Sequence, residues 1–385
     1  MKYKTMSMCG FMVGILACIA LIFPCQAVSQ EKPIIIGVAV PLTGEGAQYG
    51  QSILNSALMM AEKINEKGGV KGRKIELLPS DDRMDPREAG AVASKLVDNP
   101  DVLAVVGHFS STCSLAACPI YNSRHLVHIS PSSTSPALSK CGTYTFRDCI
   151  TDAVQGKFIA DYIVKILGKK KVFVMYELSD AHIASSEHLT RRIKELGGTV
   201  VGSEKYMSGD KDFTAIMTKA KAAKPDIIYL AAFYQEAAII TRQAKQVGLN
   251  VPYIGSDAVY ASKLIDLAKE RAEGVMATAF FNPASKNPLV VDYLKRYDKK
   301  FPGESPDSYA ANAYDAIGII ALAIEKGGFD REKIDQYMRT IGRTNPGYQG
   351  ATGTTAFDEN GDCIKPTIMV QVRKGKWVSM EKQLE

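Results

Sequence analysis

The stretch Val102-Leu-Ala-Val-Val-Gly-His-Phe-Ser-Ser-Thr112 is an apolar run that opens into hydroxyl-bearing residues. A second stretch, Leu126-Val-His-Ile-Ser-Pro-Ser-Ser-Thr134, repeats this order further along the chain. The apolar part of each, 102–106 and 126–129, predicts a buried strand. Since adjacent parallel strands end at the same edge of a sheet, we expect the two polar loops to lie side by side there.

These two loops combine hydroxyl groups with backbone N–H groups, which suits an anion such as a carboxylate. No base or nucleophile accompanies them in the sequence, so their expected task is to hold an anion and not to transform it. The alternative is that each loop is a polar turn with a helix N-cap, as most such runs are when they occur singly. The sequence leaves both interpretations open.

Strand and helix patterns alternate along nearly the whole chain, and the alternation restarts after Thr151. Two such blocks predict an α/β protein with two similar lobes, each built on a parallel sheet with its ligand site at the carboxyl edge. The predicted strands are 34–40, 74–78, 102–106, 126–129, 171–175, 199–204, 227–230, 251–255 and 274–280, the main helices are 51–66, 86–97, 153–167, 186–196, 213–223, 235–247, 289–300 and 309–326, and a hairpin turn is expected at 358–361.

Residues 1–27 have the pattern of a cleaved secretory signal peptide. Lys2 and Lys4 precede a mostly apolar run, and small residues lead to a cleavage site after Ala27. The alternatives are a membrane anchor, for which the run is short, and lipoprotein attachment, for which Cys18 and Cys25 are poorly placed. We therefore expect a secreted chain.

The charge of the chain argues against nucleic acid as a partner. Removing residues 1–27 takes away two lysines and no acidic residue, which lowers the net charge from +6 to +4. Basic and acidic residues are interspersed, without the basic blocks and aromatic residues that nucleic-acid binding favours.

Motifs for catalysis are missing as well. The sequence has no Gly-x-Ser-x-Gly, no phosphate-binding Walker loop and no His-Glu-x-x-His. Gly44-Glu-Gly-Ala-Gln-Tyr-Gly50 differs from a dinucleotide loop because Tyr49 takes the place of the third glycine, and a loop that carries Tyr49 over a cleft fits better. His182 and His188 suit no common metal pair, so we expect surface or packing histidines.

Five of the eight cysteines lie beyond residue 27. In an oxidising compartment, Cys141–Cys149 is the predicted local disulfide, closing a short loop before a strand. Cys113 and Cys118 are five apart on one helix and point in different directions, so no bridge is expected between them. With Cys363 the count is odd, which leaves at least one thiol free or paired with another molecule, and a buried inert cysteine is the default expectation.

Asp257 ends a predicted strand of the second block, in Ile254-Gly-Ser-Asp257. If the two blocks face each other, this carboxylate lies opposite the hydroxyl-bearing loops of the first block. One acid opposite an anion site is the arrangement that an α-amino acid needs for its ammonium and carboxylate groups. The alternative is an aspartate that caps a helix.

Ordered motifs along the chain closely resemble those of the periplasmic substrate-binding proteins of branched-chain amino acid ABC transporters, over residues 34–377. They are Ile36-Gly-Val-Ala-Val-Pro-Leu-Thr-Gly44, Ala47-Gln-Tyr-Gly50, Asn65-Glu-Lys-Gly-Gly-Val-Lys-Gly72, Gly107-His108, Ile129-Ser-Pro-Ser-Ser-Thr134, Gly209-Asp-Lys-Asp-Phe213 and Phe357-Asp-Glu-Asn-Gly-Asp362. The resemblance implies a type I periplasmic binding protein, with two Rossmann-like lobes joined by three hinge crossovers near 151, 280 and 366. The N-terminal lobe would be 28–151 and 281–366, and the C-terminal lobe 152–280 and 367–385.

The resemblance also implies the ligand-binding residues. The family's α-carboxylate site falls on Ser111, Ser132 and Thr134, its ammonium-binding acid on Asp257, and its side-chain walls on Tyr49, Phe233 and Tyr309. A wall tyrosine of many members aligns with Ala181, which enlarges or reshapes the pocket. The family's usual disulfide is missing, because its positions hold Ser110 and, approximately, Met84.

The implied function is to capture an amino acid, branched-chain or similarly apolar, in the cleft between the lobes. The ligand would then pass to an inner-membrane ABC permease. We expect a periplasmic monomer that is not an enzyme and that needs no cofactor, no metal and no nucleic acid. Two alternatives stay open, a sensory partner of a membrane receptor and a binder of a small carboxylate other than an amino acid.

Overall fold

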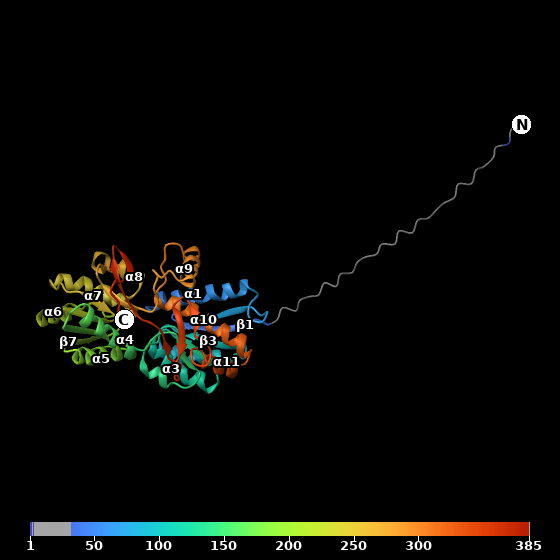
Figure 1. Ribbon diagram of the computed structural model, residues 1–385, viewed down its shortest axis with the longest axis horizontal. Helices are drawn as coiled ribbons and strands as arrows, with labels where there is room; N and C mark the ends of the chain where they lie inside the picture. Colours follow the sequence, from blue (N-terminus) through green and yellow to red (C-terminus); the bar gives the residue numbers. More distant parts are fainter. Residues whose placement is uncertain (2, 4–31, 385) are drawn as a thin grey trace. The chain divides into compact units, whose positions relative to one another are not determined.

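The computed structural model describes residues 1, 3 and 32–384 (Figure 1). The predicted signal peptide, residues 1–27, therefore lies outside the described residues apart from positions 1 and 3. Within the described part, no helix has both the length and the apolar character needed to cross a membrane.

The first sheet has five parallel strands in the order β2-β1-β3-β4-β5. Its strands are β1 (Ile34–Val40), β2 (Ile75–Asp81), β3 (Val102–Gly107), β4 (Val127–Ser130) and β5 (Thr145–Arg147), connected by α1 (Ala47–Glu66), α2 (Pro86–Asp98), α3 (Ser111–Ser123) and the 3₁₀ turn η1 (Pro136–Lys140). The first block of the sequence thus forms the parallel sheet that its pattern predicts.

The second sheet has seven strands in the order β15-β14-β10-β9-β8-β6-β7. Its parallel part consists of β6 (Lys171–Glu177), β7 (Thr199–Tyr206), β8 (Ile227–Ala231), β9 (Tyr253–Gly255) and β10 (Met276–Ala279), and its antiparallel edge of β14 (Ile368–Arg373) and β15 (Lys376–Ser379). The connecting elements are α4 (Asp152–Asp161), the π-helical turn η2 (Tyr162–Ile166), α5 (Asp180–Glu195), α6 (Thr214–Ala223), α7 (Tyr234–Gln246), η3 (Asp257–Val259), α8 (Ser262–Ala268) and η4 (Lys269–Ala272).

The chain after β10 returns to the first sheet, where α10 packs against α1 and β3 (Figure 1). This part consists of α9 (Pro288–Lys300), α10 (Ser308–Gly327), α11 (Arg331–Met338) and a small antiparallel sheet of β11 (Tyr348–Gly350), β12 (Gly353–Phe357) and β13 (Cys363–Ile364). The predicted turn at 358–361 joins β12 to β13 and is confirmed.

Local sequence explains why the first strand and helix pack closely. Ile36 and Val38 on one face of β1 and Ala39 on the other are fully buried, as expected for a strand covered on both faces. Gly50 lets α1 approach the end of β1, because a Cβ at this position would lie 1.7 Å from the carbonyl oxygen of Pro41. The α/β class with parallel central sheets, predicted from the sequence, is confirmed.

The chain passes between the two sheets three times: after β5, after β10 and after β13. A buried ion pair joins the first passage to the third. Lys365 Nζ lies 2.6 Å from Asp148 Oδ1, and both side chains have no solvent exposure. Lys365 also donates to Thr352 Oγ1 at 2.8 Å. Charge pairing of this kind is what a buried lysine requires.

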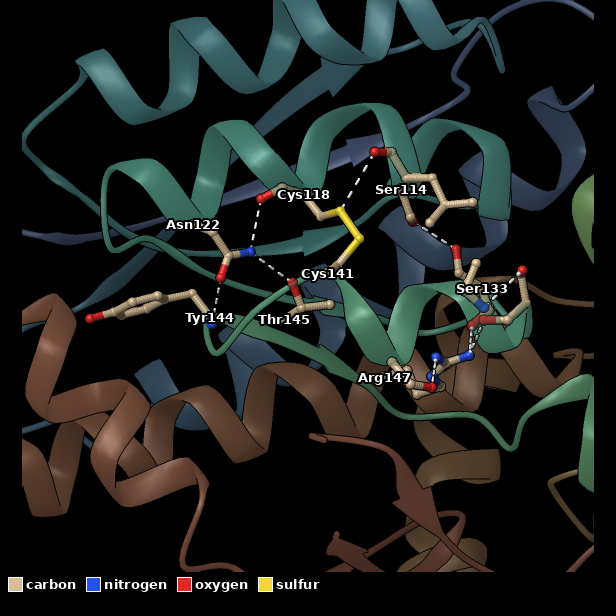
Figure 2. Close-up of a disulfide and its surroundings, with 12 residues drawn as sticks. Ser114, Cys118, Asn122, Ser133, Cys141, Tyr144, Thr145 and Arg147 are labelled. Atoms are coloured by element: carbon tan, nitrogen blue, oxygen red, sulfur yellow. Dashed lines mark hydrogen bonds between the residues drawn. A yellow bond between two sulfur atoms is a disulfide. The ribbon is translucent and has the colours of Figure 1, made fainter. Parts of the chain in front are cut away.

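The predicted disulfide is wrong: Cys118 pairs with Cys141, and Cys149 is a buried free thiol (Figure 2). Strand β5 lies between Cys141 and Cys149, and its extended residues carry the two apart by roughly 10 Å, farther than the roughly 7 Å that a bridge tolerates. Asn122 Oδ1 on α3 accepts a hydrogen bond from Tyr144 N at 3.0 Å, which holds α3 next to the loop that carries Cys141.

Candidate ligand-binding site

A cavity of about 220 Å³ lies where the carboxyl ends of strands from both sheets face each other. Larger hollows exist, such as one of about 550 Å³ beside α5, but exposed charged residues such as Arg191 and Lys194 line it. The residues that line the cavity are Met84, Phe109, Ser110, Ser111, Thr112, Ser132, Thr134, Asp152, Glu177, Leu178, Ser179, Ala181, His182, Ser208, Phe233, Ser256, Asp257, Ala258 and Tyr309.

The loop after β3 brings Ser111 to the cavity. Gly107 ends that strand with φ +141°, and a Cβ there would lie 2.1 Å from the carbonyl oxygen of Ala39, so the turn depends on glycine. Ser110 caps α3 by accepting a hydrogen bond from Cys113 N at 3.2 Å. Ser111 therefore sits in the first turn of α3, at the positive end of the helix dipole.

The loop after β4 brings Ser132 and Thr134 to the same wall. Ser132 Oγ donates to the carbonyl oxygen of Phe109 at 2.8 Å, which joins this loop to the one after β3. Buried Arg147 donates to the carbonyl oxygens of Ser133 at 3.1 Å and Ser135 at 2.9 Å (Figure 2). Both carbonyl oxygens thus accept hydrogen bonds from Arg147, and neither residue lines the cavity. The wall that faces the cavity is rich in hydroxyl groups.

Three buried carboxyl groups, Asp152, Glu177 and Asp257, lie among the lining residues that come from the second block. Gln155 Nε2 donates to Asp257 Oδ1 at 2.7 Å. Within the described residues, Asp257 Oδ2 and Asp152 Oδ2 have no hydrogen-bond partner. Oxygen atoms buried in this way favour a ligand with a donor or a positive charge.

Burial governs the protonation of these acids. Burial raises the pKa of Asp257 above its ordinary value, although the Gln155 amide lowers it. Burial, and next the charge of Asp257, raise the pKa of Asp152 to about 8. None of the described residues lining the cavity is a lysine or an arginine, so a cationic group of the ligand is the natural partner of these carboxyls.

His182 also lines the cavity, whereas the sequence predicted a surface or packing histidine. Its Nδ1 lies 3.2 Å from Glu177 Oε2 and 3.1 Å from Ser179 Oγ. Burial lowers the pKa of His182, but Glu177, Asp152 and Asp257 together raise it by more, so the pKa lies above its ordinary value. The imidazole ring packs edge-on against Phe233, with 4.9 Å between the ring centroids.

Aromatic rings form the remaining wall. Phe109, Phe233 and Tyr309 line the cavity, whereas Tyr49 lies behind them and lines a neighbouring hollow of about 240 Å³. The Tyr49 ring stacks on Phe109 with 4.6 Å between centroids, and its hydroxyl donates to the carbonyl oxygen of Ala258 at 2.7 Å. Tyr49 therefore supports the wall without being part of the cavity lining.

The structure brings seven of the eight predicted binding residues to the cavity lining, and Tyr49 is the exception. The seven are Ser111, Ser132, Thr134, Ala181, Phe233, Asp257 and Tyr309. Their individual roles stay predictions. Sequence reasoning missed Asp152, Glu177 and His182. Glu177 is the last residue of β6, so the strand-end rule applied to the other loops would have found it.

Comparisons with known proteins agree with this arrangement. Residues 33–376 match the family described as periplasmic binding protein. The leucine-, isoleucine-, valine-, threonine- and alanine-binding protein of Pseudomonas aeruginosa is 33% identical over 333 residues, 86% of this chain and 87% of that protein.

Two crystal structures extend the comparison to the fold. The leucine-binding protein LivK of Thermotoga maritima is 32% identical and has a TM-score of 0.83, over 90% of this chain and 97% of that one. LivJ of Streptococcus pneumoniae, in complex with isoleucine, is 29% identical and has a TM-score of 0.85, over 91% of this chain and 99% of that one. The fold is that of a type I periplasmic binding protein. The chain therefore belongs to the periplasmic binding protein family and, within it, is similar to the substrate-binding proteins of branched-chain amino acid ABC transporters.

Proposed function

We propose that this protein is an extracytoplasmic solute-binding protein that captures an α-amino acid in the 220 Å³ cavity and delivers it to an ABC transporter permease. One observation carries the proposal. The same small cavity is lined by neutral hydroxyl groups on one wall and by buried carboxyl groups on another. The first suits the carboxylate of an amino acid, and the second suits its ammonium group.

Each end of the ligand has assigned partners in this proposal. Ser111 and Thr134 hold the α-carboxylate, since hydroxyl groups and the N-terminus of α3 favour an anion, and Ser132, whose Oγ donates to the carbonyl oxygen of Phe109, fixes the loop that carries Thr134 against the loop that carries Ser111. Asp257 holds the ammonium group through an oxygen that has no other partner in the described chain. The side chain lies among the described walls, of which Phe233 is part.

The relatives support an amino acid as the ligand class, because the Pseudomonas protein is named for five amino acids and LivJ is in complex with isoleucine. Membership of a family of binding proteins supports capture without catalysis. The proposal includes a periplasmic monomer that is exported by the signal peptide predicted at residues 1–27. The permease is the partner that such a carrier requires.

Lobe closure is part of the same proposal. Of the described residues, 32–151 and 281–366 form one lobe, 152–280 and 367–384 form the other, and the three passages between the sheets are the hinges. Thr112 Oγ1 donates to Asp180 Oδ2 at 2.8 Å and Gln235 Nε2 to the carbonyl oxygen of Glu45 at 2.8 Å, so these bonds join the two lobes in a closed form. Small-angle scattering should show a smaller radius of gyration with ligand than without it. Equal radii would contradict closure.

A ligand screen tests the function directly. The protein, freed of bound ligand, is titrated by calorimetry with amino acids, and each hit is compared with its 2-oxo acid and with its decarboxylated amine. We expect micromolar or tighter binding of the amino acid and much weaker binding of both analogues, since each lacks one charged end. Mass spectrometry should recover the ligand unchanged. Tight binding of the 2-oxo acid, or a converted ligand, would refute the proposal.

A further inference from the structure

The cavity wall next to Ala181 is polar, and His182 is its central residue. Both residues lie in the first turn of α5 and line the cavity. Because Ala181 has only a methyl group, the larger His182 side chain supplies the surface there, and it is only 4% exposed. A buried imidazole in a ligand cavity needs polar partners for both of its nitrogen atoms.

One nitrogen of this imidazole has its partners within the protein. Nδ1 lies 3.2 Å from Glu177 Oε2 and 3.1 Å from Ser179 Oγ. The ring also packs edge-on against Phe233, which limits its rotation. Within the described residues, Nε2 has no hydrogen-bond partner, so this atom is left for a ligand.

The carboxyl groups near His182 favour its protonated form, in which Nε2 is a donor. Burial lowers its pKa, but Glu177, and to a smaller extent Asp152 and Asp257, raise it above the ordinary value. These three carboxyl groups act on the ring, and they come from the end of β6, the start of α4 and η3. An imidazolium donates through both nitrogens.

A donor at Nε2 determines which kind of ligand side chain fits next to it. An aliphatic side chain would leave this donor buried and unpaired. A cationic side chain would place donor against donor, and an anionic one would face three carboxyl groups with no lysine or arginine in the described lining. A neutral oxygen, in a hydroxyl or a carboxamide group, satisfies the donor without adding charge.

Resting on the proposed function, we propose that His182, positioned by Glu177, is a specificity-determining residue that hydrogen bonds to the ligand side chain. It favours amino acids with a hydroxyl or carboxamide side chain over aliphatic ones of the same shape. Ser179, Ser208 and Ser256 also line the cavity and make it more polar than an aliphatic ligand needs.

Two near-isosteric ligand pairs test this inference, threonine against valine and asparagine against leucine. Calorimetry on the parent protein should show the polar member of at least one pair binding about tenfold to hundredfold more tightly, the effect of one hydrogen bond to a charged donor. In His182→Phe that preference should disappear or reverse, while affinity for alanine, whose methyl side chain makes no hydrogen bond, changes by less than threefold. His182→Gln, which keeps a donor, should retain part of the preference.

The outcomes separate this inference from the proposed function. If the parent binds leucine and valine as tightly as asparagine and threonine, the inference is wrong while the proposed function stands. If no amino acid binds at all, the proposed function fails. The parent ranking decides the matter even if His182→Phe does not fold, and a far-ultraviolet spectrum with a thermal melt checks the folding of each variant.

Discussion

Replacement of Asp257 by asparagine should remove most of the binding energy for an α-amino acid. The side chain is 4% exposed, Gln155 donates to its Oδ1 at 2.7 Å, and its Oδ2 has no partner in the described chain. Asparagine has the same shape and keeps an oxygen for Gln155, so the fold should survive. Truncating one partner of a buried charge pair costs about 2–5 kcal/mol, which weakens binding by about 30-fold to several thousandfold.

The assay is calorimetry with the amino acid that the screen identifies. Asp266→Asn is the matched control, because it makes the same chemical change in the same block of the chain, on an aspartate whose side chain is 62% exposed. The control should bind like the parent. The 2-oxo acid of the same ligand, which lacks the ammonium group, should bind the parent and Asp257→Asn equally weakly.

A small effect would refute the assignment. If Asp257→Asn binds the amino acid within threefold of the parent, Asp257 does not hold the ammonium group. Asp152, whose Oδ2 also has no partner in the described chain, would then be the acid to replace.

Three further predictions concern stability. Replacing Cys118 and Cys141 by serine should lower the free energy of unfolding by about 3 kcal/mol, the chain-entropy effect of a bridge across 23 residues; an unchanged urea midpoint would contradict the bridge. Lys365→Met should lower the free energy of unfolding by about 3–5 kcal/mol because it leaves Asp148 buried without its partner. Adding Asp148→Asn should recover part of this loss, and a double variant as unstable as Lys365→Met would contradict the prediction. The pKa of Asp152 is about 8 when folded and about 4 when unfolded, so this group makes stability fall as pH rises between these values. Asp152→Asn should therefore gain stability relative to the parent between pH 5 and pH 8 in urea titrations, and a pH-independent difference would rule this out.

The fold followed from the sequence because its elements are encoded locally. The apolar run 102–106 became β3, Val102–Gly107, and the run 126–129 became β4, Val127–Ser130, each within about one residue of its expected bounds. The rule that parallel strands present their ends at one edge then placed the hydroxyl-bearing loops correctly. Pairing of Cys118 with Cys141 was missed because it depends on how α3 lies against a distant loop, which no local pattern contains.

The site was predictable only in part for the same reason. Asp257 was found because it follows the end of a strand, β9. Its partner Gln155 lies 102 residues away and was not found. Tyr49 was expected in the wall, yet its hydroxyl meets the carbonyl oxygen of Ala258, which holds the ring behind Phe109. Contacts of this kind depend on the packing of one block against the other, which composition and spacing do not reveal.

In the part of the chain that the structure describes, one disulfide beside three buried thiols has a practical consequence for preparing ligand-free protein. In the folded chain, burial raises the pKa of Cys113 to about 12 and that of Cys149 well above its ordinary value, so these thiols are inert. Cys363 is buried as well. Unfolding in denaturant, a common way to strip a tightly held ligand, would return each thiol to a pKa of about 8.5 beside an intact disulfide.

Thiolates then attack the bridge, and exchange among five cysteines produces mispaired chains that refold without the link between Cys118 and Cys141. Since only the thiolate reacts, unfolding and refolding at about pH 5, well below the thiol pKa of about 8.5, suppresses exchange by roughly three orders of magnitude. A preparation stripped at pH 8 would contain a fraction that binds weakly for reasons unrelated to its ligand-binding residues, and non-reducing peptide mapping would identify it.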